Sequence, residues 1–298
     1  MDAYDVMFVG HMCYDEIVPH DGETYVAPGS AVLCGAMAAA CTGKRIAAVL
    51  RLAPADDTIL DPMRDAGISV FAVPAAETTY SRVIHPSANV DERQMVLVRD
   101  AGFFAIGDMP AARATYVHLA GISDHEFNLE FMRALRAGGV SLSTDMQSFV
   151  RQVNSVTREI MFRDVPDKQA ITALLDKVKL DVVEAELLTG ESDLGKAAAI
   201  VASWGCPEVL ITRADGVLAR VKGVEYFEPF SNRSVVGRTG RGDTTFAAYL
   251  CRRIDHEPRE ALKFAAALVS LKMETPGPFR GSLTDVLKRM EASHRDDH

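Results

Sequence analysis

The chain alternates short apolar runs rich in β-branched residues with longer stretches whose apolar residues recur every three or four positions. The first pattern is typical of buried strands and the second of amphipathic helices, because side chains repeat every two residues along a strand and about every 3.6 along a helix. Strands are predicted at VMFVG, IAAVL, ISVFAV, TYVHLA, VSLSTD, LDVV and EVLIT, and helices at SAVLCGAMAAAC, TILDPMRDAG and EFNLEFMRALRAGG. This alternation predicts βαβ units, and therefore an α/β fold with a mostly parallel sheet.

Residues 78–104 break this rhythm. TTYSRVIHP and RQMVLVRD predict two strands, and the polar segment SANVDE that joins them is too short for a helical crossover. A second hairpin is predicted around Lys222 and Gly223, between VLARV and VEYFEPF. A hairpin that projects from a parallel core beside a cleft is typical of a lid, so we expect residues 78–104 to form one.

Ligands of open parallel sheets bind beyond the carboxyl ends of the strands. The segments expected as loops at that edge are GHMCYDE, APGSA, DMQSFVR, EAELLTG, TRADG and GRTGRGD. We therefore expect the functional side chains to come from these six segments.

Length and composition narrow the classes of function. A chain of 298 residues can form one large core, and its net charge of −9 without a Lys/Arg run argues against nucleic acid or a membrane surface as a partner. The five cysteines form no CxxC pair, which favours a reducing compartment, and the acidic N-terminus does not resemble a signal peptide. We expect a cytoplasmic protein that acts on small molecules; a homodimer is compatible with the sequence, which does not decide the oligomeric state.

The segment VVGRTGRGDTTFAAYL places Gly237, Gly240, Gly242 and Asp243 where a loop becomes a helix. Backbone N–H groups at such a helix start attract anions, and the acid could cap the helix or take part in chemistry. The segment lacks the Lys of a Walker A loop, and it lies too near the C-terminus for a dinucleotide-binding fingerprint.

TGRGDTTFAAYL resembles the signature TGAGDTFxAG of the ribokinase-like (PfkB) family of sugar and nucleoside kinases. The resemblance implies a three-layer α/β/α fold over residues 1–298, with ATP and Mg²⁺ as cofactors. It also implies that Asp243 is the base that deprotonates the acceptor hydroxyl, that the N–H groups of Gly240, Arg241, Gly242 and Asp243 hold the transferred phosphoryl group, and that Thr239 lies beside the nucleotide. This agrees with phosphoryl transfer, which depends on positioning and charge stabilisation.

The motif departs from the family at two places. Gly237 and Arg238 stand where members usually have Asp-Thr, and Arg241 stands where Ala is usual between the glycines. Arg241 could reach the phosphate, where a cation favours an anionic transition state, or it could point to solvent.

The resemblance extends to the N-terminal part of the chain. It implies that Asp15 in FVGHMCYDEIV grips substrate hydroxyls and that Gly29 belongs to the turn that opens the next helix. In this turn Pro28 replaces the first glycine of the usual pair, and Leu33 stands where an Asn is usual, which removes a polar group. A solvated loop position is the alternative for Asp15.

On the nucleotide side, KLDVVEAELLTG resembles the NxxE segment of the family, with Asp181 in place of the Asn and Glu184 as the Glu. The resemblance implies that Glu184 organises Mg²⁺ and its waters, which is usual for a hard cation held by few carboxylates. The alternative is an ordinary acid in the first turn of a helix. VLITRADG resembles the TxGxxG strand and loop, which would place Thr212 and Gly216 near ATP.

Two segments bear on the acceptor. GHMCYDEI resembles GxxCxD of plant myo-inositol kinases, and SLSTDMQSFVRQV resembles their DxQxxxR segment, which places Asp145, Gln147 and Arg151 near the cleft. Acids and amides suit a ring of hydroxyls, so a polyol or sugar acceptor is favoured.

Two alternatives remain open. Tyr80, Phe103 and Phe104 could instead stack on a nucleobase, as in a nucleoside kinase. The altered motif also leaves open a ligand sensor without activity. His118, in an apolar strand, is expected to be a hydrogen-bonded core residue rather than a ligand.

Overall fold

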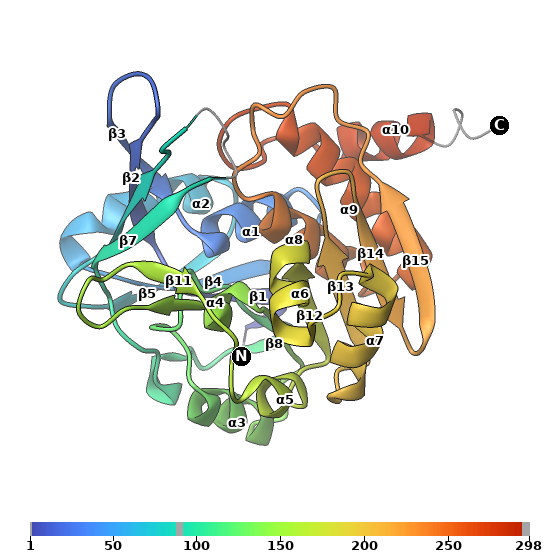
Figure 1. The fold of residues 1–298 in the computed structure, drawn as a ribbon, viewed down its shortest axis with the longest axis horizontal. Coiled ribbons are helices and arrows are strands. Elements are labelled where there is room, and N and C mark those ends of the chain that lie inside the picture. Colours follow the sequence, from blue (N-terminus) through green and yellow to red (C-terminus); the bar gives the residue numbers. More distant parts are fainter. Residues whose placement is uncertain (1, 88–91, 294–298) are drawn as a thin grey trace.

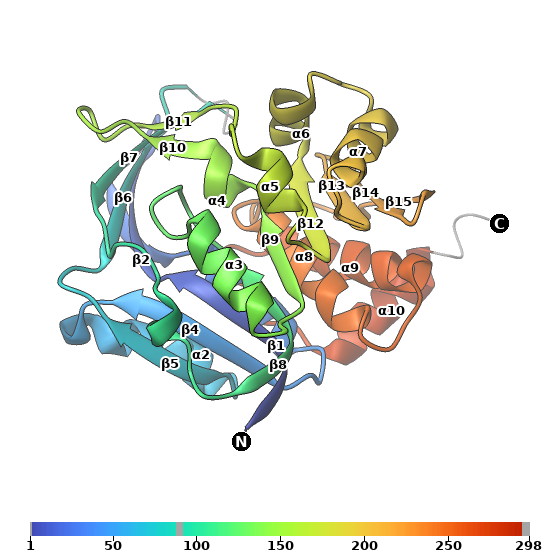
Figure 2. The same cartoon turned by 90° about the horizontal axis from the view of Figure 1, so that it is seen from below.

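The computed structural model describes residues 2–87 and 92–293, and its main feature is a nine-stranded sheet with helices on both faces (Figures 1 and 2). The strand order is β15-β14-β13-β12-β9-β8-β1-β4-β5, and all neighbours from β13 to β5 are parallel. The strands are β1 (Ala3–His11), β4 (Ile46–Leu52), β5 (Ser69–Pro74), β8 (Arg113–Leu119), β9 (Leu142–Asp145), β12 (Lys177–Asp181), β13 (Glu208–Thr212), β14 (Gly216–Val221) and β15 (Val224–Pro229). The mostly parallel α/β prediction is confirmed.

Helices cover each face and form two separate cores. On one face lie α1 (Ala31–Ala40), α2 (Asp61–Asp65), α8 (Arg241–Arg252), α9 (Pro258–Met273) and α10 (Leu283–Ser293). The other face carries α3 (Leu129–Ala137), α5 (Lys168–Thr172), α6 (Val182–Thr189) and α7 (Leu194–Ser203). Two 3₁₀ helices, Pro54–Leu60 and Ile106–Asp108, complete the connections. The fold is therefore a three-layer α/β/α arrangement.

Side-chain caps fix where several helices begin. Ser30 accepts from the Leu33 N–H at the start of α1, and Asn128 accepts from the Phe131 N–H at the start of α3. Pro258 occupies the first turn of α9, where its missing N–H costs nothing. Because these residues immediately precede or open apolar periodic stretches, they are local signals that the sequence contains.

A second sheet stands apart from the large one (Figure 1). It has the order β3-β2-β6-β7, with β2 (Cys13–Val18), β3 (Tyr25–Gly29), β6 (Thr79–Ile84) and β7 (Gln94–Arg99). The expected hairpin of residues 78–104 corresponds to β6 and β7, which pair antiparallel; the tip of its loop, residues 88–91, lies outside the described residues. The expectation that GHMCYDE is a loop was wrong, because β2 continues the chain after Met12 and pairs with both β3 and β6.

His11 joins the two sheets at the end of β1. Its ring hydrogen-bonds through Nδ1 to Thr79 Oγ1 at 2.8 Å and through Nε2 to the Gly102 carbonyl at 2.8 Å, and its backbone N–H donates to Glu126 at 2.7 Å. All these groups come from segments far apart in sequence, so the junction forms only when the tertiary structure does.

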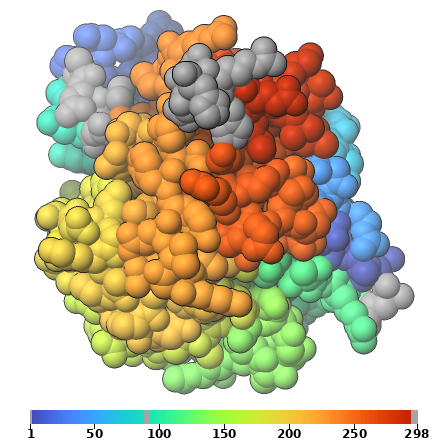
Figure 3. Space-filling model, turned by 90° about the vertical axis from the view of Figure 1, so that its right-hand side faces the viewer, coloured from blue at the N-terminus to red at the C-terminus, as the bar shows by residue number. Residues whose placement is uncertain are grey.

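The remaining elements lie at the margins. Residues predicted as the loop DMQSFVR form the short helix α4 (Gln147–Val150), followed by a hairpin of β10 (Arg151–Val153) and β11 (Ile160–Phe162) that packs against β7. At the other end of the large sheet, β13, β14 and β15 run antiparallel, and β15 lies at the surface beside α9 (Figure 3).

Candidate functional site

The glycine-rich segment forms the N-terminus of α8, as expected. Gly240 caps the helix with φ 78°, a left-handed conformation that favours glycine, and Asp243 lies in the first turn. One carboxylate oxygen of Asp243 accepts a hydrogen bond from Gln147 Nε2 at 3.2 Å, and the same Nε2 donates to the Gly121 carbonyl at 3.0 Å. Asp243 and Gln147, which are 96 residues apart, are therefore brought together with their orientation fixed.

The three glycines are needed for close contacts as well as for conformation. A Cβ atom at Gly240 would lie 2.5 Å from Cys34 Sγ, one at Gly242 would lie 2.6 Å from Lys179 Nζ, and one at Gly237 would lie 1.8 Å from the Thr275 carbonyl oxygen. Such separations are far inside van der Waals contact. The segment is therefore packed against α1, β12 and the end of α9 by backbone rather than by side chains.

Beneath the start of α8 lies a buried ion pair. Lys179 Nζ lies 2.8 Å from Asp145 Oδ2 and 4.0 Å from Glu184, and all three side chains are nearly inaccessible. Burial disfavours the charged form of Lys179, but the carboxylates of Asp145, Glu184 and Asp181 outweigh it and hold its pKa above the ordinary value. A fixed positive charge therefore sits directly below Gly242.

Asp145 was expected to bind substrate, but its position points to a supporting role. It is 1 % exposed, and besides Lys179 it accepts from the Gln147 N–H at 3.1 Å. These contacts occupy the carboxylate and orient the residue that holds Asp243. Asp145 thus lies at the site, one layer below its surface.

Asp15 lies in β2, on the small sheet, instead of in a loop. Its carboxylate accepts from Cys13 Sγ at 3.4 Å, and a Cβ atom at Gly29, on the adjacent strand, would lie 2.0 Å from Asp15 Oδ2. Burial raises the pKa of Asp15, while the Cys13 hydrogen bond and the positive charges of Arg93 and Arg151 oppose the shift. Gly29 is therefore the residue that leaves room for this carboxylate.

Electrostatic coupling indicates that charged residues of the large and small sheets lie near one another around the start of α8. The Cys34 thiol, which touches the Gly240 position, lies within the field of both Asp243 and Asp15. Arg93, an exposed residue immediately before β7, lies within the electrostatic field of Arg151, Asp181, Asp15 and Asp243.

Arg151 is the third residue of the predicted DxQxxxR segment to reach the cleft. It begins β10, it is half-buried, and its Nε atom is buried without a hydrogen-bond partner among the described residues. An unsatisfied guanidinium nitrogen facing carboxylates is suited to a polar or anionic ligand.

Asp181 and Glu184 form a reciprocal cap at the start of α6. Glu184 N–H donates to Asp181 Oδ1 at 2.9 Å, and Asp181 N–H donates to Glu184 Oε2 at 2.8 Å. The other oxygen of Glu184, Oε1, is buried without a partner, and burial raises the pKa of Glu184 to about 8, opposed by Lys179. One capped, orphaned carboxylate fits a magnesium ion bound mainly through phosphate and water, and no group of three or more ligating side chains occurs within residues 2–87 and 92–293.

Further arginines lie toward the far side of the α8 N-terminus. Arg241 is half-buried; burial lowers its pKa, as does its neighbour Arg238, while Asp181 and Asp215 oppose the shift. The side of the glycine segment that faces Asp181 and Asp215 is therefore rich in positive charge. The Thr239 side chain beside it is exposed.

Thr212 and Gly216, expected near ATP, contact the strands on either side of the β13–β14 hairpin, β12 and β15. Thr212 Oγ1 donates to the Leu180 carbonyl at 3.4 Å, and a Cβ atom at Gly216 would lie 2.5 Å from the ring of Phe227. These contacts account for both residue types by packing. Their role in nucleotide binding stays a prediction.

The aromatic residues considered for a nucleobase are dispersed. Phe104 is 3 % exposed and stacks on Phe127 at 5.6 Å in the core, so the expectation that it could stack on a ligand was wrong. Phe103 is exposed beside His125, and Tyr80 carries Arg99 over its ring at 4.8 Å. His118 is buried, with its Nδ1 atom 3.2 Å from Ser143 Oγ, as expected for a core residue.

Sequence reasoning missed Lys179, Cys34 and Arg93. The sequence contains a signal for Lys179: a lysine inside the strand KVKLD of a parallel sheet must be buried and therefore paired with an acid. Cys34 and Arg93 had none, since small apolar helices and loop arginines are common and only the tertiary structure brings these two to the cleft.

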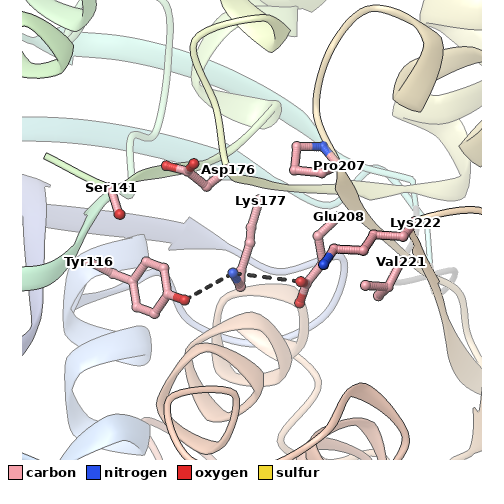
Figure 4. A pocket seen from close by; sticks show the side chains of 8 residues that line it. All are labelled: Tyr116, Ser141, Asp176, Lys177, Pro207, Glu208, Val221 and Lys222. Carbon is pink, nitrogen blue, oxygen red and sulfur yellow. Dashed lines mark hydrogen bonds and ion pairs between the residues drawn. The ribbon is translucent and has the colours of Figure 1, made fainter. Parts of the chain in front are cut away.

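A separate cavity lies at the opposite edge of the large sheet, where β12 and β13 begin (Figure 4). It is lined by Tyr116, Ser141, Asp176, Lys177, Pro207, Glu208, Val221 and Lys222. Its buried charges satisfy one another: Lys177 donates to Tyr116 at 3.1 Å and pairs with Glu208 at 3.6 Å. None of the predicted site residues lines it, which leaves the glycine segment and the small sheet as the candidate site.

The profile of the pfkB family carbohydrate kinases matches residues 4–284 of the chain. The chain belongs to the pfkB family. It is a kinase that transfers a phosphoryl group to an alcohol group, and its α/β/α fold is the ribokinase-like fold. No helix within residues 2–87 and 92–293 is long and apolar enough to span a bilayer.

Several pfkB kinases of known structure or activity are similar to this chain. A pyrophosphate-dependent kinase of the ribokinase family, solved with a pyrophosphate analogue and myo-inositol, is 31% identical, with a TM-score of 0.86 over 96% of this chain and 99% of the other. Arabidopsis thaliana ribokinase, solved with ribose and ATP, is 20% identical with a TM-score of 0.77 over 97% and 99% of the two chains. The cytidine kinase of Thermococcus kodakarensis is 24% identical over 83% of this chain and 87% of its own length.

Proposed function

We propose that this pfkB kinase phosphorylates a hydroxyl of a cyclic polyol of the myo-inositol type, with Asp243 as the base. The observation that carries the proposal is the placement of Asp243 in the first turn of α8, held by Gln147, directly above the charge of Lys179. The Arg241 N–H donates to the Arg238 carbonyl at 3.1 Å, so the other N–H groups of this turn, beside the carboxylate, are the ones suited to bind developing negative charge.

The transfer itself needs one bond formed and one broken. The acceptor oxygen bonds to the terminal phosphorus of the donor as the bond from that phosphorus to its bridging oxygen breaks, and the leaving group departs with the bonding electrons. Asp243 takes the hydroxyl proton. The N–H groups of Gly240, Gly242 and Asp243, together with Lys179 below them, would stabilise the charge on the transferred group; the Arg241 N–H is occupied by the Arg238 carbonyl.

The acceptor side of the cleft would be formed by Asp15, Gln147 and Arg151. A carboxylate, an amide and a guanidinium offer acceptors and donors from several directions, as a ring of hydroxyls requires. Of the candidate aromatic residues, Phe104 is buried in the core, which weakens the nucleoside alternative. The myo-inositol complex of the relative with 31% identity supports the same acceptor class.

We propose that the preferred phosphoryl donor is pyrophosphate rather than ATP, the donor that the family resemblance implies. Arg238 and Arg241 stand in the glycine segment where members of the family usually carry Thr and Ala, and Arg93 and Arg151 face the same cleft. Guanidinium groups bind phosphate through paired hydrogen bonds, so a donor made only of phosphates suits this set. The pyrophosphate-dependent relative with 31% identity supports this choice.

Glu184 would hold the magnesium ion. Its orphaned Oε1 is the oxygen available for the ion or a water bound to it, with Asp181 fixing the carboxylate through the cap. When bound, the ion would neutralise part of the phosphate charge.

The small sheet of β2, β3, β6 and β7 would act as a lid over the acceptor, within one kinase unit. It carries Asp15 and approaches the cleft through Arg93, so closure would complete the acceptor site and exclude water.

The test is a turnover matrix with purified protein and Mg²⁺. Pyrophosphate and ATP are each offered with myo-inositol, other polyols, sugars and cytidine, and the phosphorylated product is measured directly. We expect the fastest turnover with pyrophosphate and a cyclic polyol. Faster turnover with ATP would reverse the order of donors, preference for cytidine would favour a nucleoside kinase, and no product in any combination would favour a sensor.

A further inference from the structure

Lys272 is a fully buried lysine in the last turn of α9, and the proposed chemistry does not use it. Its side chain is 0 % exposed, and its Nζ atom donates hydrogen bonds to the carbonyl oxygens of Gly237 and Thr239. Within the described residues it pairs with no carboxylate; the field of Asp243 reaches it, but the atoms that contact its ammonium are backbone carbonyls of the glycine segment.

Burying an ammonium group away from a counter-ion is costly unless strong acceptors replace its water. Burial lowers the pKa of Lys272, whereas Cys34 and Asp243 oppose the shift. A leucine or methionine would fill this space in the core without that cost. The lysine is therefore suited to a positional task, because its charge draws two carbonyls toward one point.

The same turn of α9 contacts the glycine segment in other ways. The Gly237 N–H donates to the Met273 carbonyl at 2.8 Å, and the Gly237 Cα packs against the Thr275 carbonyl. Carbonyls that converge on a buried positive charge form the type of site that proteins also use for dehydrated monovalent cations. Here the charge is covalently attached to the helix that supports the loop.

We propose that Lys272 is a tethered cation that organises the glycine segment, so that this kinase needs no monovalent cation from solution to form its phosphoryl-binding loop. The carbonyls of Gly237 and Thr239 set the direction of the chain immediately before Gly240. The ammonium group thereby fixes where the N–H groups of the first turn of α8 point. Lys272 is a positioning residue, since it acts through the loop and touches no reacting atom.

The experiment compares Lys272→Ala, which leaves a cavity beside the two carbonyls, with Lys272→Met, which fills it without a charge. The exposed Lys288→Ala, on α10, is the matched control. Each protein is titrated with ammonium chloride and potassium chloride, and choline chloride controls for ionic strength. The first readout is the thermal unfolding midpoint without substrate, which does not depend on the proposed activity.

We expect ammonium and potassium to raise the midpoint of Lys272→Ala saturably and to leave the wild type, Lys288→Ala and Lys272→Met at their choline values. If Lys272→Ala folds only when ammonium or potassium is present, that result supports the proposal equally. A midpoint that responds to these salts no more than to choline would overturn it, as would an Ala variant that is unfolded in every salt beside a Met variant of normal turnover.

The second readout is turnover, and this part rests on the proposed function. Misplacing the loop should lower kcat by about 10²-fold in both variants, with recovery by ammonium or potassium only in Lys272→Ala. A wild type that requires added potassium would contradict the inference. A wild type without any turnover would overturn the proposed function, while the unfolding midpoints would still decide the role of Lys272.

Discussion

At the scale of single residues, the site depends on a few side chains whose conformations are fixed by hydrogen bonds and one ion pair. Asp243 is held by the Gln147 amide, Gln147 is held by Gly121 and Asp145, and Asp145 is paired with Lys179. Each contact fixes the position of the next group, so Asp243, the proposed base, is supported by a buried chain of polar groups. Such support reduces the reorganisation needed during the reaction.

Replacing Asp243 with Asn should lower kcat by roughly 10²–10⁴, the usual loss for a general base, and leave the fold and donor binding intact. The amide keeps the shape of the carboxylate and cannot take the proton. Steady-state turnover with the best substrate pair, together with a donor titration, measures both quantities. Asp65→Asn, an exposed change on α2, is the control, and a variant that keeps half of the wild-type rate would remove Asp243 from this role.

Replacing Asp15 with Ala should lower kcat/KM for the acceptor by about 1–3 kcal/mol, or roughly 5- to 150-fold, because substrate hydroxyls lose their acceptor on closure. The Kd of the donor should stay unchanged. Glu16→Ala is the matched control, since it is adjacent on β2, its side chain points to the opposite side of the strand, and its pair with Arg82 is exposed. Equal losses in both variants would indicate damage to the strand.

At the scale of elements, the glycine segment and its supports behave as one unit. Gly237→Ala would press a methyl group into the Thr275 carbonyl, whereas Gly107→Ala would meet no atom within 4 Å. We expect the first change to cost about 1–3 kcal/mol of stability through overpacking and the second to be nearly neutral. Urea unfolding midpoints measure the difference, and similar midpoints for the two variants would show that the segment is free to move.

The same scale shows what the sequence could and could not predict. Period-two and period-3.6 patterns located the strands of the large sheet and the helices α1, α2, α3 and α8, since those patterns reflect which face is buried. The segments DMQSFVR and EAELLTG, expected as loops, instead contain α4 and most of α6. The patterns missed β2 and β3, whose residues are only half-buried and therefore carry little periodic signal. Asp15 was singled out by its position after the first strand, yet its place on β2 depends on pairing with β6, about 65 residues away.

Within the site, motif residues could be predicted and their supports could not. The glycines and Asp243 stand together in one short segment, so local sequence contains the helix start. Lys179, Cys34 and Lys272 come from three other elements and contact that segment only through tertiary packing. Asp145 was expected near the substrate, and its burial under Gln147 could not be foreseen because it follows from the path of β9 and α4.

At the scale of the whole molecule, the stability of the fold should depend on pH through His118. This buried imidazole lies between Phe8 and Phe246, and burial lowers its pKa to about 3. His118 therefore stays neutral in the folded state at pH values below about 6.5, at which the imidazole of the unfolded chain binds a proton. Its contribution to stability is complete above that value and is lost progressively as the pH falls from about 6.5 toward 3.

The variant His118→Asn keeps a polar group near Ser143 and removes the titration. Over that interval the free energy of unfolding of the wild type should fall by up to about 1.4 kcal/mol per pH unit more steeply than that of the variant. Denaturant titrations at several pH values give both slopes. Parallel slopes would mean that His118 binds a proton in the native protein as readily as in the unfolded chain.

The parallel pairing of β2 with β6 also determines when the small sheet can assemble. β2 and β3 become neighbours of β6 and β7 only after β4 and β5 have taken their places, because the chain passes through those two strands between the two halves of the small sheet. The small sheet should thus be the last part to fold and the first to open, and amide protons of β2 and β3 should exchange with deuterium well before those of β1. Opening of the small sheet alone would let substrates enter and products leave while the three layers of the large sheet and its helices stay folded.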